Sequence, residues 1–155
     1  WNVAMGNESQ RDITSGCNNV GLGRRAQNSI TTGSRNVAIG ALAGFARGEG
    51  EETSLYETIT ANDQILIGYQ ATQADDEAQY DNIIAIGSRA RSANNGVALG
   101  ARARAIGANS VAVGYMADAT EDNSVVLGNA SVETLIVGNK RIIFNNDGTV
   151  TWVSL

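Results

Sequence analysis

Residues 95–114 read NGVALGARARAIGANSVAVG and contain two copies of one pattern, NGVALG ending at Gly100 and NSVAVG ending at Gly114. In each copy a turn residue is followed by a β-branched residue, a small residue, a larger apolar residue and a glycine. The pattern occurs eight times, with wider and unequal spacing in the first copies and a spacing of about 14 residues in the last ones, and such self-similarity is typical of a solenoid. The glycines that end the copies are Gly6, Gly23, Gly40, Gly68, Gly87, Gly100, Gly114 and Gly128.

The residues three and one before each glycine are apolar in every copy, and the first of them is always β-branched. Because they are two positions apart, they share one face of a short strand. The residue between them, for example Ala38, Ala85 or Ala98, is mostly small and lies on the opposite face. About two large side chains per coil do not offset the ordering entropy of about 14 residues. We therefore expect this alanine column to let identical chains pack closely around an axis.

Asn stands just ahead of most strands, where it tolerates left-handed dihedral angles and marks the corners of the coil. These residues are Asn2, Asn18, Asn19, Asn36, Asn82, Asn95, Asn109 and Asn123. About 14 residues at about 3.3 Å each allow two short strands and two tight turns, stacked about 4.8 Å apart as a parallel β-roll. A coiled coil is disfavoured, because the unequal spacing of the repeat glycines breaks any heptad register.

The segments NVAIG at 36–40, NSVAVG at 109–114 and NSVVLG at 123–128, each followed by Ala or Ser three residues later, resemble the head repeats of YadA-like trimeric autotransporter adhesins. Similar repeats occur in bacteriophage tail fibres. The resemblance covers residues 2–138, and we assign residues 1–138 to the repeat domain. It implies an all-β, left-handed parallel β-roll that assembles as a homotrimer.

Residues 139–155 form a different segment. Two alternating runs, 141–144 and 149–153, flank the turn sequence Asn-Asn-Asp-Gly at 145–148, which predicts a β-hairpin. We expect this hairpin to cap the last open strand edge. It is similar to the segment that ends many phage fibres, whereas adhesin heads usually continue into a basic neck and a coiled coil. We therefore predict the receptor-binding or distal part of a trimeric phage tail fibre, located in the virion, that attaches to a bacterial surface glycan or protein.

Two alternatives stay open. The first is the head of an autotransporter adhesin on the bacterial surface, which binds host matrix or cells. The second is a tailspike polysaccharide depolymerase, which needs two carboxylates about 5–9.5 Å apart. No sequence pattern identifies such a pair, and the absence of His excludes a Ser-His nucleophile. We predict no enzymatic activity, no cofactor and no metal site. Membrane insertion is not expected, because no run of about 18 apolar residues is present.

Two insertions interrupt the repeat, at about residues 45–62 and 72–82, and we expect both to be loops outside the solenoid. Loops on a rigid scaffold often carry binding, aromatic rings stack on sugars, and carboxylates accept hydrogen bonds from hydroxyl groups. The candidate receptor-binding residues are Glu49, Glu51, Glu52, Tyr56, Glu57, Asp75, Asp76 and Tyr80. The alternative is a pair of solvated acidic loops with no partner.

Four arginines, Arg89, Arg91, Arg102 and Arg104, recur on successive coils. The net charge of −5 disfavours nucleic acid as a partner. The pattern favours a surface ladder opposed to nearby acidic residues, and contact with phosphate or sialic acid is the alternative.

Overall fold

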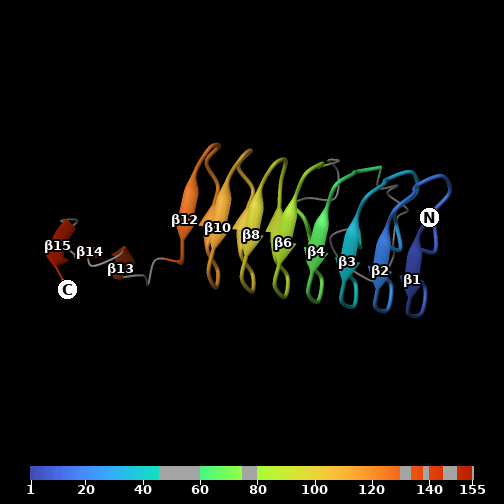
Figure 1. Ribbon diagram of the computed structural model, residues 1–155, viewed down its shortest axis with the longest axis horizontal. Coiled ribbons are helices and arrows are strands. Elements are labelled where there is room, and N and C mark those ends of the chain that lie inside the picture. The colour runs from blue at the N-terminus through green and yellow to red at the C-terminus, as the bar shows by residue number, and fades with distance from the viewer. Residues whose placement is uncertain (46–59, 75–79, 130–133, 138–139, 145–149, 155) are drawn as a thin grey trace.

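The computed structural model describes residues 1–45, 60–74, 80–129, 134–137, 140–144 and 150–154. Within these ranges the chain forms strands and turns, and none of the described residues is helical or part of a membrane-spanning helix. The chain winds as a solenoid whose successive coils stand side by side along one axis (Figure 1). The strands are β1 (Val3–Met5), β2 (Val20–Leu22), β3 (Val37–Ile39), β4 (Ile65–Ile67), β5 (Thr72–Gln73), β6 (Ile84–Ile86), β7 (Arg91–Ser92), β8 (Val97–Leu99), β9 (Arg104–Ala105), β10 (Val111–Val113), β11 (Asp118–Ala119), β12 (Val125–Leu127), β13 (Thr134–Val137), β14 (Lys140–Phe144) and β15 (Val150–Ser154).

Two parallel sheets form the walls of the solenoid. The larger sheet has eight strands in the order β1-β2-β3-β4-β6-β8-β10-β12, and the smaller has four in the order β11-β9-β7-β5. Each repeat residue pairs with its equivalent in the next coil, so that Val97 lies opposite Val111 and Ala98 opposite Ala112. The predicted all-β parallel solenoid is confirmed. Its handedness and its trimeric state stay predictions.

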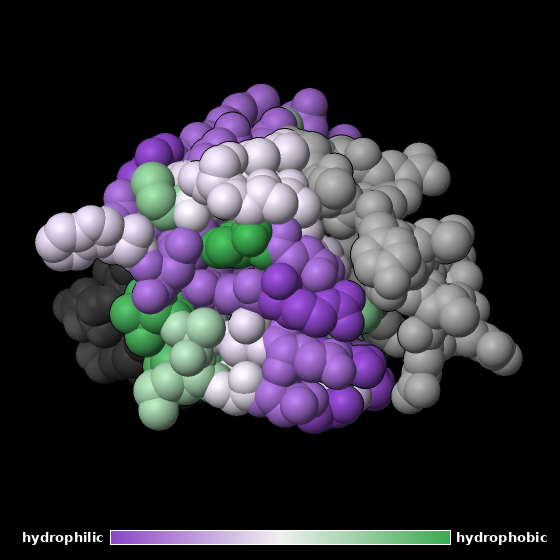
Figure 2. All heavy atoms as spheres, turned by 90° about the vertical axis from the view of Figure 1, so that its right-hand side faces the viewer, coloured by the Kyte–Doolittle hydropathy of each residue, from purple (hydrophilic) through white to green (hydrophobic). Residues whose placement is uncertain are grey.

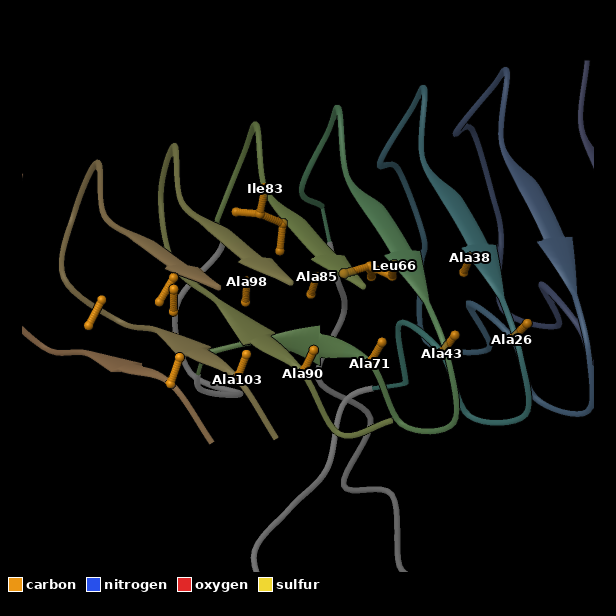
Figure 3. Close-up of a cluster of buried hydrophobic side chains, with 14 residues drawn as sticks. Ala26, Ala38, Ala43, Leu66, Ala71, Ile83, Ala85, Ala90, Ala98 and Ala103 are labelled. Atoms are coloured by element: carbon orange, nitrogen blue, oxygen red, sulfur yellow. The ribbon is translucent and has the colours of Figure 1, made fainter. Parts of the chain in front are cut away.

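The core is a narrow layer of methyl groups between the two walls. Ala85 and Ala98 of the large sheet lie across the interior from Ala90 and Ala103, and all four are fully buried (Figure 3). Our prediction that the alanine column packs against other chains is therefore wrong. In most coils the space between the two backbone layers at this strand position admits little more than a methyl group, so the small residues point inward. The larger residues three and one before each repeat glycine point outward.

The repeated glycines allow the coils to stack closely. Gly100 has a φ of +135°, and a Cβ added there would lie 2.4 Å from the carbonyl oxygen of Gly114 in the next coil. No L side chain fits this conformation and this space without strain. The glycine column thus maintains the close contact between coils.

Asn serves two purposes at the corners. Five of the predicted corner residues have left-handed dihedral angles, with φ between 54° and 59°, as expected. They are Asn18, Asn82, Asn95, Asn109 and Asn123. Asn19 and Asn36 instead are buried and bridge neighbouring coils. The Nδ2 of Asn19 donates to the Gly33 carbonyl at 2.8 Å, and its Oδ1 accepts from the Asn36 backbone at 3.0 Å.

The C-terminal strands form a separate antiparallel sheet in the order β13-β14-β15. β14 pairs with β15, with Ile142 opposite Trp152, as expected for a hairpin. β13, which we assigned to the repeat domain, also pairs antiparallel with β14. Leu135 stands where the repeat requires a β-branched residue, so β13 departs from the repeat pattern. In Figure 1 the sheet stands beyond β12, and its function as a cap stays a prediction.

Candidate interaction surfaces

One wall of the solenoid presents apolar side chains to the outside. We call the outward residues of the large sheet, three and one before each repeat glycine, the apolar face. Seven of its members are more than one third exposed in the single chain, and its other members are half-buried. The seven exposed residues are Val3, Met5, Ile39, Ile65, Ile86, Val125 and Leu127. A contiguous apolar surface of this kind marks an interaction site.

Figure 2 looks onto the N-terminal end of the solenoid. Hydrophobic side chains gather on the left of this view, on the side of the large sheet, whereas hydrophilic ones lie at the top and at the lower right. The side chains on the two faces of the large sheet therefore differ in size, with mostly alanines on the inner face and larger apolar residues on the outer face. The size difference itself was visible in the sequence, whereas the structure shows which of the two faces is the outer one.

The predicted receptor-binding loops fall mostly outside the described residues. Glu49, Glu51, Glu52, Tyr56, Glu57, Asp75 and Asp76 belong to this group. Tyr80 is described. It is half-buried and packs against the alanine core, and its carbonyl accepts a hydrogen bond from Gln64 Nε2 at 2.8 Å. Tyr80 thus has a structural contact at the base of the second insertion.

An ion pair connects two corners on the outside of the solenoid. Arg35 donates through Nε and Nη2 to the two carboxylate oxygens of Asp63, at 2.6 and 2.7 Å. This hydrogen-bonded guanidinium lowers the pKa of Asp63, and the same pairing raises the pKa of Arg35. Both residues occupy the left-handed corner position that Asn fills in later coils. The pair replaces an Asn corner with a charged contact between coils.

The arginine stripe has fewer acidic partners than we predicted. Only Arg104 has a carboxylate partner among the described residues, Asp118 at 3.1 Å. Arg89 Nε donates to Gln70 Oε1 at 3.2 Å, and its guanidinium lies 5.9 Å from the centre of the Tyr69 ring. The predicted pairing of the arginines with acidic residues is therefore formed at one of the four positions in the described part of the chain.

Comparison with protein families finds one match. The model of the YadA head domain repeat matches residues 105–131 in two copies, which include β10, β11 and β12. The chain therefore carries YadA head repeats, as the resemblance predicted. These repeats come from adhesin heads, which supports adhesion and a surface-exposed location. Comparisons with curated proteins and with solved structures find no match.

Proposed function

We propose that this chain is the binding module of a homotrimeric extracellular fibre that attaches to a cell surface. The apolar face carries this proposal, because each large side chain removed from water contributes about 1.5–3 kcal/mol to assembly. Copies that each present this face can close into a symmetric ring. The YadA head repeats support three copies.

The assembly is tested with one charge on the apolar face and one elsewhere. Ile86 is 37% exposed on this face, whereas Thr120 is exposed just after β11. We expect sedimentation to give a trimer for the wild type and for Thr120→Glu, and a monomer for Ile86→Glu, because a carboxylate cannot be buried unpaired in the interface. A wild-type chain that stays folded as a monomer at low micromolar concentration would contradict the proposal.

Within this class we favour the distal part of a bacteriophage tail fibre. The C-terminal strands support a tail fibre. The sequence of residues 139–155 is similar to the segment that ends many phage fibres and predicted a hairpin, and β14 and β15 pair as such a hairpin in the sheet β13-β14-β15. The second candidate is the head of an autotransporter adhesin, which the match at residues 105–131 supports. Immunogold labelling with an antibody against this chain distinguishes them. Labelled virions indicate the tail fibre, and a labelled bacterial surface indicates the adhesin.

The proposed receptor is a bacterial surface glycan or protein, bound in part by the insertion loops. Replacing Glu49, Glu51, Glu52 and Glu57 by Gln and Tyr56 by Ala should abolish adsorption of the trimer to cells. Substitution is preferable to deleting residues 48–61, because the deletion would also remove the Ala61 carbonyl, which accepts a hydrogen bond from buried Asn36. The substitution Thr120→Glu is the control, and unchanged adsorption of the loop variant would exclude the first loop as the contact.

We further propose that the module binds without catalysis. Incubation with capsule or O-antigen polysaccharide should leave chain length unchanged, as measured by size-exclusion chromatography. Shortened chains would indicate a depolymerase instead.

A further inference from the structure

Positive charge is concentrated in one part of this acidic chain. Residues 82–117 contain four arginines and no Asp or Glu, whereas the whole chain has a net charge of −5. All four belong to two consecutive copies of the motif Gly-x-Arg-x-Arg, which begin at Gly87 and Gly100. We call Arg89, Arg91, Arg102 and Arg104 the arginine block.

The fold brings these arginines together as a two-by-two array. Arg91 lies directly opposite Arg104 in the pairing of β7 with β9. The backbone amide of Arg102 donates to the Ser88 carbonyl at 2.9 Å, so the turns that carry Arg89 and Arg102 are also stacked. Neighbouring coils are about 4.8 Å apart, and like charges at this spacing repel each other. The repulsion within the array therefore destabilises the fold unless anionic groups neutralise the arginines.

The protein compensates the array only in part. Asp118 pairs with Arg104, and Arg89 contacts Gln70 and Tyr69, as described above. The guanidinium groups of Arg91 and Arg102 have no hydrogen-bond or carboxylate partner among the described residues. Arg102 is exposed and Arg91 is half-buried, so both remain accessible to a ligand.

Two tyrosines flank the arginine block along the axis. Tyr69 and Tyr115 each follow a repeat glycine directly and are 45% and 58% exposed. They are three coils apart, which is about 14 Å at about 4.8 Å per coil. The equivalent residues of the two coils between them are small and exposed, Ser88 and Ala101. Two aromatic residues thus stand at the ends of a row of small side chains beside four cations.

We propose that the arginine block, together with Tyr69 and Tyr115, binds an anionic oligosaccharide whose carboxylate or phosphate groups repeat along its chain. Guanidinium groups bind carboxylate and phosphate in a bidentate manner, and aromatic rings stack on sugar rings. The inference rests on the proposed function, since it gives the chemical class of the surface glycan. It uses a different surface from the insertion loops.

Self-assembly through the apolar face leaves the small-sheet part of this site open. β7 and β9 belong to the small sheet, which lies across the alanine core from the large sheet (Figure 3). Copies that cover the apolar face of the large sheet therefore leave the outward side chains of Arg91 and Arg104 accessible. The repetition of the site in each protomer would raise the avidity for a polyvalent surface.

The test uses the whole chain in its native oligomeric state and a defined probe, an octamer of galacturonic acid. Its methyl ester has the same length and no charge, and a single-stranded DNA octamer serves as a second polyanion. Binding is measured by calorimetry at about 50 and about 300 mM salt, a range over which screening changes strongly. We expect the acidic octamer to bind at least tenfold more tightly than its ester and than the DNA, with weaker binding at high salt.

Variants locate the site. Arg91→Gln combined with Arg102→Gln should weaken octamer binding at least tenfold, because these two guanidinium groups lack partners among the described residues. The control, Arg11→Gln combined with Arg24→Gln, removes the same charge from exposed residues of the N-terminal coils. It should change the affinity for the octamer less than twofold. Tyr115→Ala should weaken binding of the octamer without changing its salt dependence.

If the octamer binds, three outcomes would still overturn the inference. They are equal binding of the acidic octamer and its ester, equal binding of the octamer and the DNA, and equal effects of the two double variants. If the trimer adheres to cells while the octamer does not bind, the inference fails and the proposed function stands. If the octamer binds at the arginine block while the trimer adheres to no cell surface, the proposed function fails and the site stands.

Discussion

The N-terminal and C-terminal coils of the solenoid fill their interiors with different side chains. The coils that end at Gly23 and Gly40 are the longer ones and bury amide side chains, among them Gln10, Gln27 and Asn36. The coils that end at Gly100, Gly114 and Gly128 are shorter, and their buried side chains are mostly Ala.

The difference shows what the extra residues in a long coil require. A longer coil leaves backbone groups inside that cannot all pair with the next coil, and buried polar groups must have hydrogen-bond partners. Amide side chains provide some of these partners: Gln10 Nε2 donates to the Val3 carbonyl at 3.1 Å and to Gln27 Oε1 at 2.9 Å, whereas Gln27 Nε2 has no partner among the described residues. The short coils instead contribute β7, β9 and β11 to the second sheet, whose parallel pairing satisfies their backbone directly.

The largest expected effect is that of adding a Cβ to a glycine of the solenoid. The loss should be large where the Cβ would collide with backbone atoms and small where it would contact a movable side chain. Gly100→Ala should lower the free energy of unfolding by about 3 kcal/mol or more, since the added Cβ collides with the Gly114 carbonyl at a positive φ. Gly21→Ala should cost about 1 kcal/mol, because its Cβ meets the movable side chains of Ser9 and Gln10. Urea unfolding at one fixed protein concentration measures both, and equal losses would contradict this distinction.

The second prediction concerns the buried Asn side chains that connect neighbouring long coils by hydrogen bonds. Asn36 donates through Nδ2 to the Ala61 carbonyl at 2.9 Å and accepts at Oδ1 from the Gln64 backbone N–H at 3.0 Å. Asn36→Ala leaves both groups buried without partners and should cost about 3 kcal/mol. Ser110, at the equivalent position of a short coil, donates only to the Gly107 carbonyl. Ser110→Ala should cost about 1 kcal/mol in the same urea assay, and a larger loss than that of Asn36→Ala would contradict the comparison.

The third prediction concerns the width of the core. Leu66 is buried at a position where most coils have Ala, and the neighbouring coil contributes Gly44, whose added Cβ would lie 3.1 Å from Leu66 Cδ1. Ala98 is fully buried and lies across the interior from Ala90 and Ala103, so Ala98→Leu should cost about 2 kcal/mol by overpacking. Thermal melting followed by circular dichroism measures the loss. A variant as stable as the wild type would mean that the short coils are wider than the structure shows.

The smallest expected effect concerns the charged corner in the long coils. Because the pKa of Asp63 is lower in the folded chain than in the unfolded chain, its ion pair with Arg35 stabilises the fold above the ordinary pKa of an Asp. This contribution is lost as the pH falls through the lowered pKa. Asp63→Asn should therefore lower the melting temperature slightly at pH 7, and the difference from the wild type should shrink as the pH is lowered toward 2. A constant difference across this range would show that the charge of Asp63 contributes nothing.

The repeat pattern predicted much of this fold and less of the interaction surfaces. The alternation in Val97-Ala98-Leu99 gave the strand, the repeat glycines gave the stacking, and the Asn residues gave five of the left-handed corners. Alternation alone does not say which side of a strand is inside, so the alanine column was assigned to the wrong surface. The arginine block was recognised as a stripe, but its missing partners depend on distances between coils.

The amino-acid sequence by itself determined the repeat, the parallel stacking of equivalent residues and the separate C-terminal strands, because each follows from local spacing and backbone preference. Only the tertiary structure decided that alanines fill the interior and that Val, Ile and Leu face outward. The physical reason is the short distance between the two walls of one coil, which in most coils leaves room for methyl groups and admits the larger side chain of Leu66 where a glycine lies beside it. That distance is a property of the closed coil and of no single strand.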